Sequence, residues 1–313
     1  MPSWGKRSRW PAVAAWCAFW TGLCALPAAA APVRDDVIGQ PGFWQTRQED
    51  TLLDIGIDND LGYIEMRAAN PDVDPWMPGA GKILSLPTQH ILPDAPRRGI
   101  VINLPELRLY YFPPGGGEPR SFPIGIGGEG KETPVGQTRV QRKGAHPTWI
   151  PTRSEHEEDP DLPDRIAPGP DNPMGDYALY LGWSGYAIHG TNRPYSIGRR
   201  DSHGCIRMYP ADIQALYGMV AVGTPVTVVD QSVKVGWSGD ELFLEIHWEQ
   251  ADAESLETTG QPRFIEEADA DDKVAAIAGP DVVRLNWYAI HLAEVHRNGL
   301  AVQVSLPGNR ARY

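Results

Sequence analysis

Cysteine and basic residues are scarce in this chain of 313 residues. It has three cysteines, and its 28 Lys and Arg residues are outnumbered by 40 Asp and Glu residues, which gives a net charge of −12. Phosphate backbones are bound by clustered Lys and Arg, so this balance argues against a nucleic-acid partner. An apolar content of 42% is typical of a globular protein.

Long apolar runs are also missing, with one exception near the N-terminus. Three basic residues precede an apolar stretch over residues 12–26, and small residues follow at 28–31. This pattern is typical of a signal peptide with an A-x-A cleavage site, and the stretch is short for a membrane span. We therefore predict that residues 1–30 are a signal peptide and that no membrane span remains after its cleavage.

Export would leave Cys205 as the single thiol of the mature chain, because Cys17 and Cys24 lie in the predicted signal peptide. An intramolecular disulfide is then impossible. A lone thiol is a liability in an oxidising compartment, so its presence there indicates a chemical role.

Residues 43–88 have a character of their own. The patterns predict a strand, a short helix capped at Asp50-Thr51, a second helix that ends at Asn70-Pro71, and a returning strand. The expected order is therefore β-α-α-β within a small module.

The two following regions differ in their patterns. Residues 97–230 consist of alternating or apolar strand patterns between Gly and Pro turns, with a long acidic, proline-rich loop over 154–175 and one helix over 210–220. Residues 231–313 predict a hairpin, a helix over 282–297 and a short strand, which together form a C-terminal α+β subdomain. The expected fold class is mainly β, with a β-sandwich-like catalytic domain at 97–230.

The sharpest pattern joins a histidine to a cysteine. His189-Gly190 ends one strand pattern, and the run SHGCIRM at 202–208 holds Cys205. A thiol attacks as its thiolate, so it needs a base or a positive environment. Gly190 and Gly204 allow a close backbone approach and leave N–H groups for an oxyanion. The pattern indicates nucleophilic acyl transfer.

At these residues the sequence resembles the L,D-transpeptidase family, also called the YkuD domain, over roughly residues 97–230. The family pattern is a His, a spacer, then Ser/Thr-His-Gly-Cys and usually Arg or Asn two residues later, and this chain keeps all of it. Further matches are TPVG at 133–136 and GPDNPMG at 169–175. Residues 43–88 resemble the LysM module, which binds glycans that contain N-acetylglucosamine. The layout is similar to the proteobacterial subgroup whose enzymes attach Braun's lipoprotein to peptidoglycan.

The resemblance implies roles for the motif residues. Cys205 would attack the carbonyl of diaminopimelate at the third stem position with release of D-alanine, and His189 would be the general base and acid. Arg207 would either hold a substrate carboxylate or brace its loop. The residues implied to shape the site and its oxyanion hole are Gly190, Ser202, His203 and Gly204, with the backbone N–H groups of Gly204 and Cys205 as oxyanion donors. No cofactor is implied.

One alternative stays open at this point, and two further interpretations are set aside. His203 could replace His189 as the base, because sequence gives no geometry. A metal site of His189, His203 and Cys205 would lack a fourth ligand at recognisable spacing, so no metal is expected. The run G-x-x-x-x-G-K at 125–131 is read as a strand turn, because Glu132 follows where a phosphate loop needs Ser or Thr.

The predicted function is that of a periplasmic L,D-transpeptidase that acts on peptidoglycan stem peptides and binds the glycan. The preferred acyl acceptor is a lysine of an outer-membrane lipoprotein, and a second stem peptide or water is the alternative. A non-catalytic glycan-binding protein is the alternative of another class.

Overall fold

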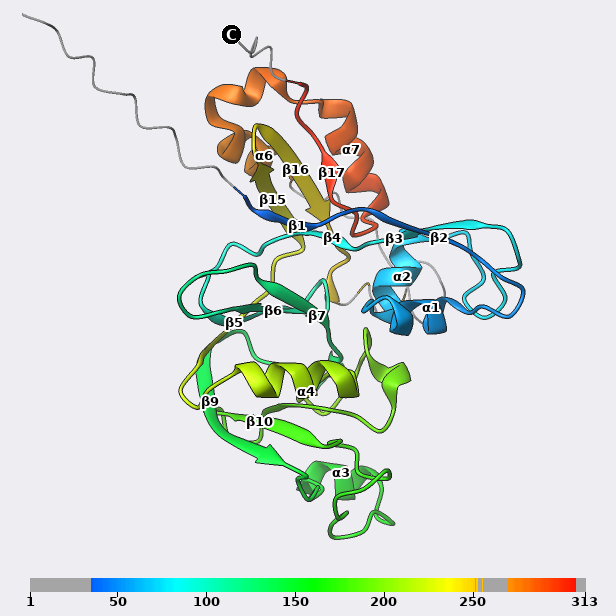
Figure 1. Cartoon of the computed structure of the whole chain (residues 1–313), viewed down its shortest axis with the longest axis vertical. Coiled ribbons are helices and arrows are strands. Elements are labelled where there is room, and N and C mark those ends of the chain that lie inside the picture. The colour runs from blue at the N-terminus through cyan, green and yellow to red at the C-terminus, as the bar shows by residue number, and fades with distance from the viewer. Residues whose placement is uncertain (1–34, 251, 253–254, 256–269, 308–313) are drawn as a thin grey trace, which may run out of the picture. The chain divides into compact units, whose positions relative to one another are not determined.

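A computed structural model describes residues 35–250, 252, 255 and 270–307 (Figure 1). The predicted signal peptide at residues 1–30 lies outside these described residues. Within them the fold is mainly β, as predicted, and no helix is long and apolar enough to cross a membrane.

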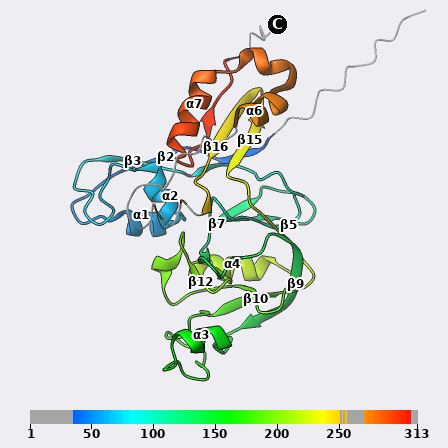
Figure 2. The ribbon, with the colours of Figure 1, turned by 180° about the vertical axis from the view of Figure 1, so that it is seen from behind.

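The central element is an eight-stranded mixed sheet in the order β13-β11-β10-β9-β14-β5-β6-β7 (Figures 1 and 2). Its strands are β5 (Gly99–Asn103), β6 (Arg108–Phe112), β7 (Arg120–Pro123), β9 (Gly136–Ala145), β10 (Tyr177–Leu181), β11 (Ala187–His189), β13 (Ile206–Arg207) and β14 (Pro225–Val229). Its buried residues include Ile100, Leu109 and Ile188, and the helix α4 (Pro210–Met219) adds Ile213 and Leu216 to the same core. The strands β8 (Ile126–Gly127) and β12 (Arg200–Ser202) form a parallel pair beside β13, the strand that follows Cys205.

The small N-terminal module has the predicted β-α-α-β order. Its elements are β2 (Gly42–Gln45), α1 (Leu52–Asp58), α2 (Tyr63–Ala69) and β3 (Ile83–Leu86), and β2 pairs with β3. Thr51 caps α1 by accepting a hydrogen bond from the Asp54 N–H at 3.0 Å. Asn70 fixes the end of α2 to β3, because its side-chain amide bonds both the N–H and the carbonyl of Ser85 at 2.9 Å.

The C-terminal region has its own sheet and core. The strands β15 (Val233–Ser238), β16 (Glu241–Ile246) and β17 (Val302–Gln303) form the sheet, and the helical elements are α6 (Ala270–Ala278), a 3-10 helix at Gly279–Arg284 and α7 (Trp287–His296). The sheet packs with α6 and α7 through Leu244, Val274 and Ile290.

Two helical predictions need correction. The helix expected over 282–297 begins only at Trp287, where Asn286 caps it, and the residues before it form the 3-10 helix. The loop expected over 154–175 contains the short helix α3 (Arg153–Glu158), which Thr152 caps. The acidic composition of this segment concealed its helix.

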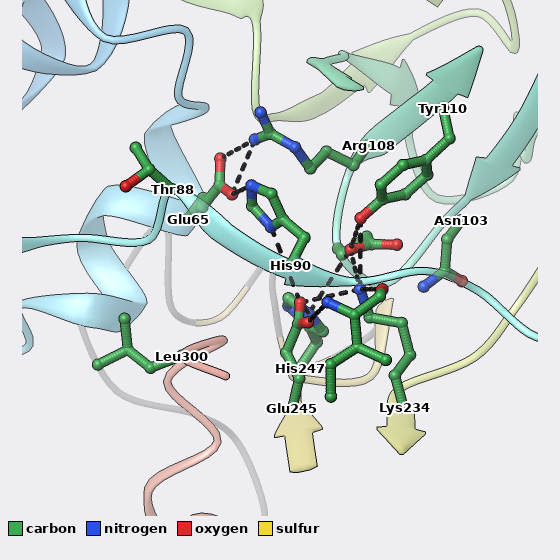
Figure 3. Close-up of polar contacts among 12 residues, drawn as sticks. Glu65, Thr88, His90, Asn103, Arg108, Tyr110, Lys234, Glu245, His247 and Leu300 are labelled. Atoms are coloured by element: carbon green, nitrogen blue, oxygen red, sulfur yellow. Dashed lines mark hydrogen bonds and ion pairs between the residues drawn. The ribbon is translucent and has the colours of Figure 1, made fainter. Parts of the chain in front are cut away.

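A buried ionic cluster joins the three regions (Figure 3). The Lys234 ammonium on β15 lies 2.5 Å from Glu106 Oε2 and 2.9 Å from Glu245 Oε1, and it donates to the Ile91 carbonyl at 2.7 Å. The side chains of Lys234, Glu106 and Glu245 are at most 1% exposed. Ile91 belongs to β4 (Gln89–Ile91), which pairs with β1 (Val37–Gly39). The cluster therefore ties β4 to the C-terminal hairpin and to the catalytic sheet.

A second ion pair extends this cluster into the small module. Arg108 on β6 donates from Nη1 to both oxygens of Glu65 on α2, at 2.8 Å each, and both residues are buried. His90 lies between the two ion pairs, 3.9 Å from Glu65 and 3.9 Å from Glu245. Burial lowers the pKa of His90 to about 3, so this histidine is neutral at neutral pH.

Removal of the Lys234 ammonium should lower the stability of the fold strongly. Lys234→Met leaves Glu106 and Glu245 buried without their cation, so the free energy of unfolding should fall by about 3–5 kcal/mol. Urea denaturation followed by circular dichroism measures the change. Lys82→Met is the matched control, because Lys82 is exposed. Equal midpoints for the two variants would show that the cluster does not hold the regions together.

Candidate active site

The parallel pairing of β11 with β13 brings the predicted nucleophile and base to one place. Ile188 pairs with Ile206 and His189 pairs with Arg207. Side chains alternate along a strand, so both isoleucines face the core, where each is 0% exposed, and His189 and Arg207 share the opposite face. Cys205 immediately precedes β13, two residues before Arg207, so its segment adjoins the segment of His189.

Cys205 is a neutral thiol at rest. Burial raises its pKa, against the opposing effects of a hydrogen bond from the Ala187 N–H and of the Arg207 charge. Sγ lies 3.5 Å from the Gly185 carbonyl, which can accept only from a protonated sulfur. The thiol therefore depends on a base to release its proton.

His189 has the tautomer that such a base needs. Its Nδ1 lies 2.6 Å from the Gly190 carbonyl, which can only accept, so Nδ1 carries the proton and Nε2 has a free lone pair. Burial lowers the pKa of His189 to about 4, with a smaller lowering effect from Arg207. The imidazole is therefore neutral, and able to accept a proton, throughout the neutral range.

The backbone around Cys205 is fixed by two hydroxyl groups. Ser202 Oγ accepts from the Gly204 N–H at 3.1 Å and donates to the Cys205 carbonyl at 2.6 Å. Thr133 Oγ1 donates to the Gly204 carbonyl at 2.8 Å. Gly204 has a φ of +98°, and a Cβ there would lie 2.9 Å from the Tyr186 ring, so only glycine fits.

This arrangement changes the expected oxyanion hole. Sequence analysis assigned the N–H groups of both Gly204 and Cys205 to it. The Gly204 N–H is already donated to Ser202, which leaves the Cys205 N–H as the candidate donor.

The contacts of His203 do not suit the role of base. Its Nε2 lies 2.9 Å from Glu158 Oε2 and 2.7 Å from the Lys131 ammonium, and its Nδ1 lies 3.7 Å from Glu155 Oε1. Both ring nitrogens thus face α3 or Lys131. The geometry favours His189 over His203 as the base.

Arg207 braces the nucleophile segment. Its Nη1 lies 2.8 Å from Asp201 Oδ1, and its side chain is 21% exposed. Of the two roles considered for Arg207, this contact supports bracing, and binding of a substrate carboxylate stays a prediction.

The helix α3 is the part of the site that sequence analysis missed. A pattern was present: Thr152 and Glu155 have the S/T-x-x-E spacing of a capping box, and the Glu155 carboxylate does accept from the Thr152 N–H at 2.6 Å. The helix brings Glu155 and Glu158 to the ring of His203.

Comparisons with known proteins identify the family of this chain. The YkuD family profile, described as the L,D-transpeptidase catalytic domain, matches residues 97–228. The probable L,D-transpeptidase YcfS of Escherichia coli is 40% identical over 251 residues, which cover 74% of this chain and 78% of YcfS. This chain belongs to the L,D-transpeptidase family.

Other L,D-transpeptidases match over shorter spans. The probable enzyme ErfK/SrfK of Salmonella typhimurium is 43% identical over 69% of this chain and 72% of its own length. The probable enzyme YbiS of Escherichia coli is 48% identical over 60% of this chain, and the match spans 63% of YbiS. Among solved structures, the catalytic domain of the Enterococcus faecium L,D-transpeptidase is 27% identical, covers 44% of this chain and 100% of that domain, and has a TM-score of 0.35.

A group of residues that could hold a metal ion lies elsewhere in the chain. Among the described residues, ligand atoms of His90, Glu106 and Glu245 converge within 4.8 Å of one another. The Lys234 ammonium already contacts both carboxylates, so a cation of the protein's own fills this position (Figure 3). We therefore interpret the group as part of the ionic cluster.

The base assignment predicts different effects of the two histidines. His189→Ala should slow acylation of Cys205 by a factor on the order of 10² or more, whereas His203→Ala should cause a clearly smaller loss. In the wild type, the rate should fall as the pH drops through about 4, where His189 becomes protonated. Stopped-flow acylation from pH 3.5 to 8 tests both points. A large loss in His203→Ala alone would transfer the role of base to His203.

Proposed function

We propose that this chain is a peptidoglycan L,D-transpeptidase that works through a Cys205 thioester. The observation that supports the proposal is the pairing of β11 with β13, which sets His189 beside the segment of Cys205, together with the contact between His189 Nδ1 and the Gly190 carbonyl. Family membership supports the same reaction class. The exported location that residues 1–30 predict would put the enzyme in the periplasm, beside its substrate.

The first half-reaction forms the acyl-enzyme. His189 Nε2 takes the thiol proton while the sulfur attacks the carbonyl of the third-position diaminopimelate. The Cys205 N–H stabilises the oxyanion, the bond to the terminal D-alanine breaks, and the imidazolium returns its proton to the leaving amine. The products are a thioester at Cys205 and free D-alanine.

The second half-reaction transfers the acyl group to an amine. We propose a lysine of an outer-membrane lipoprotein as the acceptor, in line with the predicted subgroup. A second stem peptide would give a 3-3 cross-link, and water would give a carboxypeptidase. Muropeptide analysis of a deletion strain separates these acceptors, because each leaves a different product.

We also propose that the small module at 43–88 holds the glycan. A groove of about 570 Å³ runs between this module and the 192–201 segment, and it contains Thr51, Asp54, Trp76 and Tyr195. The rings of Trp76 and Tyr195 are more than half exposed. Exposed rings beside polar side chains suit a sugar, which has one apolar and one hydroxylated aspect.

Covalent trapping tests the nucleophile. A strained carbapenem ring should acylate Cys205 and leave a slowly hydrolysed thioester, and a penicillin should react less because it mimics a bond between two D-alanines. Intact-mass spectrometry of the mature chain should show one adduct that is absent in Cys205→Ala. Circular dichroism checks that the variant is folded. An adduct that survives the substitution would rule out Cys205.

Sedimentation with insoluble peptidoglycan tests the glycan site. Trp76→Ala should leave more of the full chain in the supernatant than the wild type, because it removes an exposed ring from the groove. Phe43→Ala is the control: Phe43 is 69% exposed on β2 but does not line the groove. Equal losses for the two variants would indicate non-specific adsorption.

A further inference from the structure

The helix α3 holds one carboxylate in a fixed orientation beside the segment of His203 and Cys205. Oε2 of Glu155 accepts from the Thr152 N–H at 2.6 Å and from Thr152 Oγ1 at 2.8 Å. Oε1 faces the nucleophile segment, 3.7 Å from Nδ1 of His203, which is two residues before Cys205. The side chain of Glu155 is 15% exposed, so its charge is only partly screened by water.

The neighbouring charges do not neutralise Glu155. Glu158 takes the Lys131 ammonium at 2.5 Å, and Arg207 is paired with Asp201. Among the ion pairs of the described residues, Glu155 has His203 as its partner and neither a lysine nor an arginine. A negative charge therefore remains beside His203, two residues before Cys205.

This charge acts on both partners of the first proton transfer. The Glu155 carboxylate adds to the effect of burial in raising the pKa of Cys205, which disfavours the thiolate. It also raises the pKa of His189, against the lowering effect of burial, which strengthens the base. The two effects oppose each other in that transfer, so the charge contributes little to the first half-reaction.

We propose that Glu155 is the specificity-determining residue for the acyl acceptor: it binds the acceptor as an ammonium ion beside the Cys205 thioester and so favours transfer to amines over hydrolysis. The inference rests on the proposed acyl transfer and names the acceptor class as a cationic primary amine. Water carries no charge and gains nothing from the carboxylate.

The chemistry of the second half-reaction uses this charge in one defined step. An alkyl ammonium must lose one proton before its nitrogen can attack, and His189 Nε2 accepts that proton. The nitrogen then forms a C–N bond to the thioester carbonyl, and the C–S bond breaks. A second amine proton goes to the leaving sulfur and restores the thiol. Glu155 stabilises both the incoming ammonium and the imidazolium that its proton creates.

The chain contains a matched pair of variants for the test. Glu155→Gln removes the charge but keeps the cap of α3, because glutamine serves equally at this position of a capping box. Glu157→Gln is the control: Glu157 lies on the same helix, is 64% exposed and pairs with Arg153.

The experiment follows the two half-reactions separately on the mature chain. A tetrapeptide with diaminopimelate and terminal D-alanine is the donor, and intact-mass spectrometry measures acylation of Cys205. The acyl-enzyme is then offered either a lysine-containing peptide, which is cationic, or hydroxylamine, which is uncharged at neutral pH. Chromatography with mass detection gives the ratio of transfer to hydrolysis.

Glu155→Gln should acylate at least as fast as the wild type, and its transfer-to-hydrolysis ratio with the lysine peptide should fall roughly tenfold, the scale of a one-unit pKa shift. Its ratio with hydroxylamine should stay within about twofold of the wild type, because hydroxylamine carries no charge for Glu155 to bind. Both ratios of Glu157→Gln should also stay within about twofold, because an exposed charge has an effect of that order. An unchanged ratio with the lysine peptide, or an equal fall with hydroxylamine, would overturn the role of Glu155. Absence of acylation in the wild type would instead overturn the proposed function.

Discussion

The buried ammonium of Lys234 is the contact on which the arrangement of the three regions depends. It bonds to Glu106, which precedes the catalytic strand β6, to Glu245 on the C-terminal hairpin, and to the backbone of β4 at Ile91. A buried charge without its partner costs several kcal/mol, so these groups must assemble together. The cluster thereby joins β4 and the C-terminal hairpin to the β6 side of the sheet. The Cys205 segment lies at the opposite side of the sheet, next to β13.

Burial serves a different purpose at the catalytic pair. It keeps the Cys205 thiol protonated and the His189 imidazole neutral, so these two side chains do not form a thiolate–imidazolium ion pair at rest. The thiolate is the species that oxidants attack, and a protonated thiol is much less reactive. In its protonated form the Cys205 thiol is therefore poorly reactive towards oxidants.

Local patterns were enough for much of the fold, and the roles that they predict for the site residues stay predictions. The adjacency of the His189 and Cys205 segments and the cap at Thr51 follow from short motifs whose chemistry is contained in a few residues. The role of α3 escaped prediction because its acidic, proline-rich composition hides a one-turn-and-a-half helix. The Lys234 cluster escaped because its members are up to about 180 residues apart along the chain, and no local period relates them. Which distant charged residues meet depends on how the whole chain packs, and the sequence of one segment does not show that packing.

The pairing of β5 with β14 has a consequence for how the enzyme is made. Val226 lies beside Ile100 in a parallel register, so the middle of the sheet is built from strands separated by more than a hundred residues. Such non-local contacts raise the contact order and slow folding, and they cannot form until the later strand has been synthesised. The catalytic segments lie between these two strands in the chain. The half of the sheet that holds the Cys205 and His189 segments is therefore joined to β5, β6 and β7 only after most of the polypeptide has been synthesised.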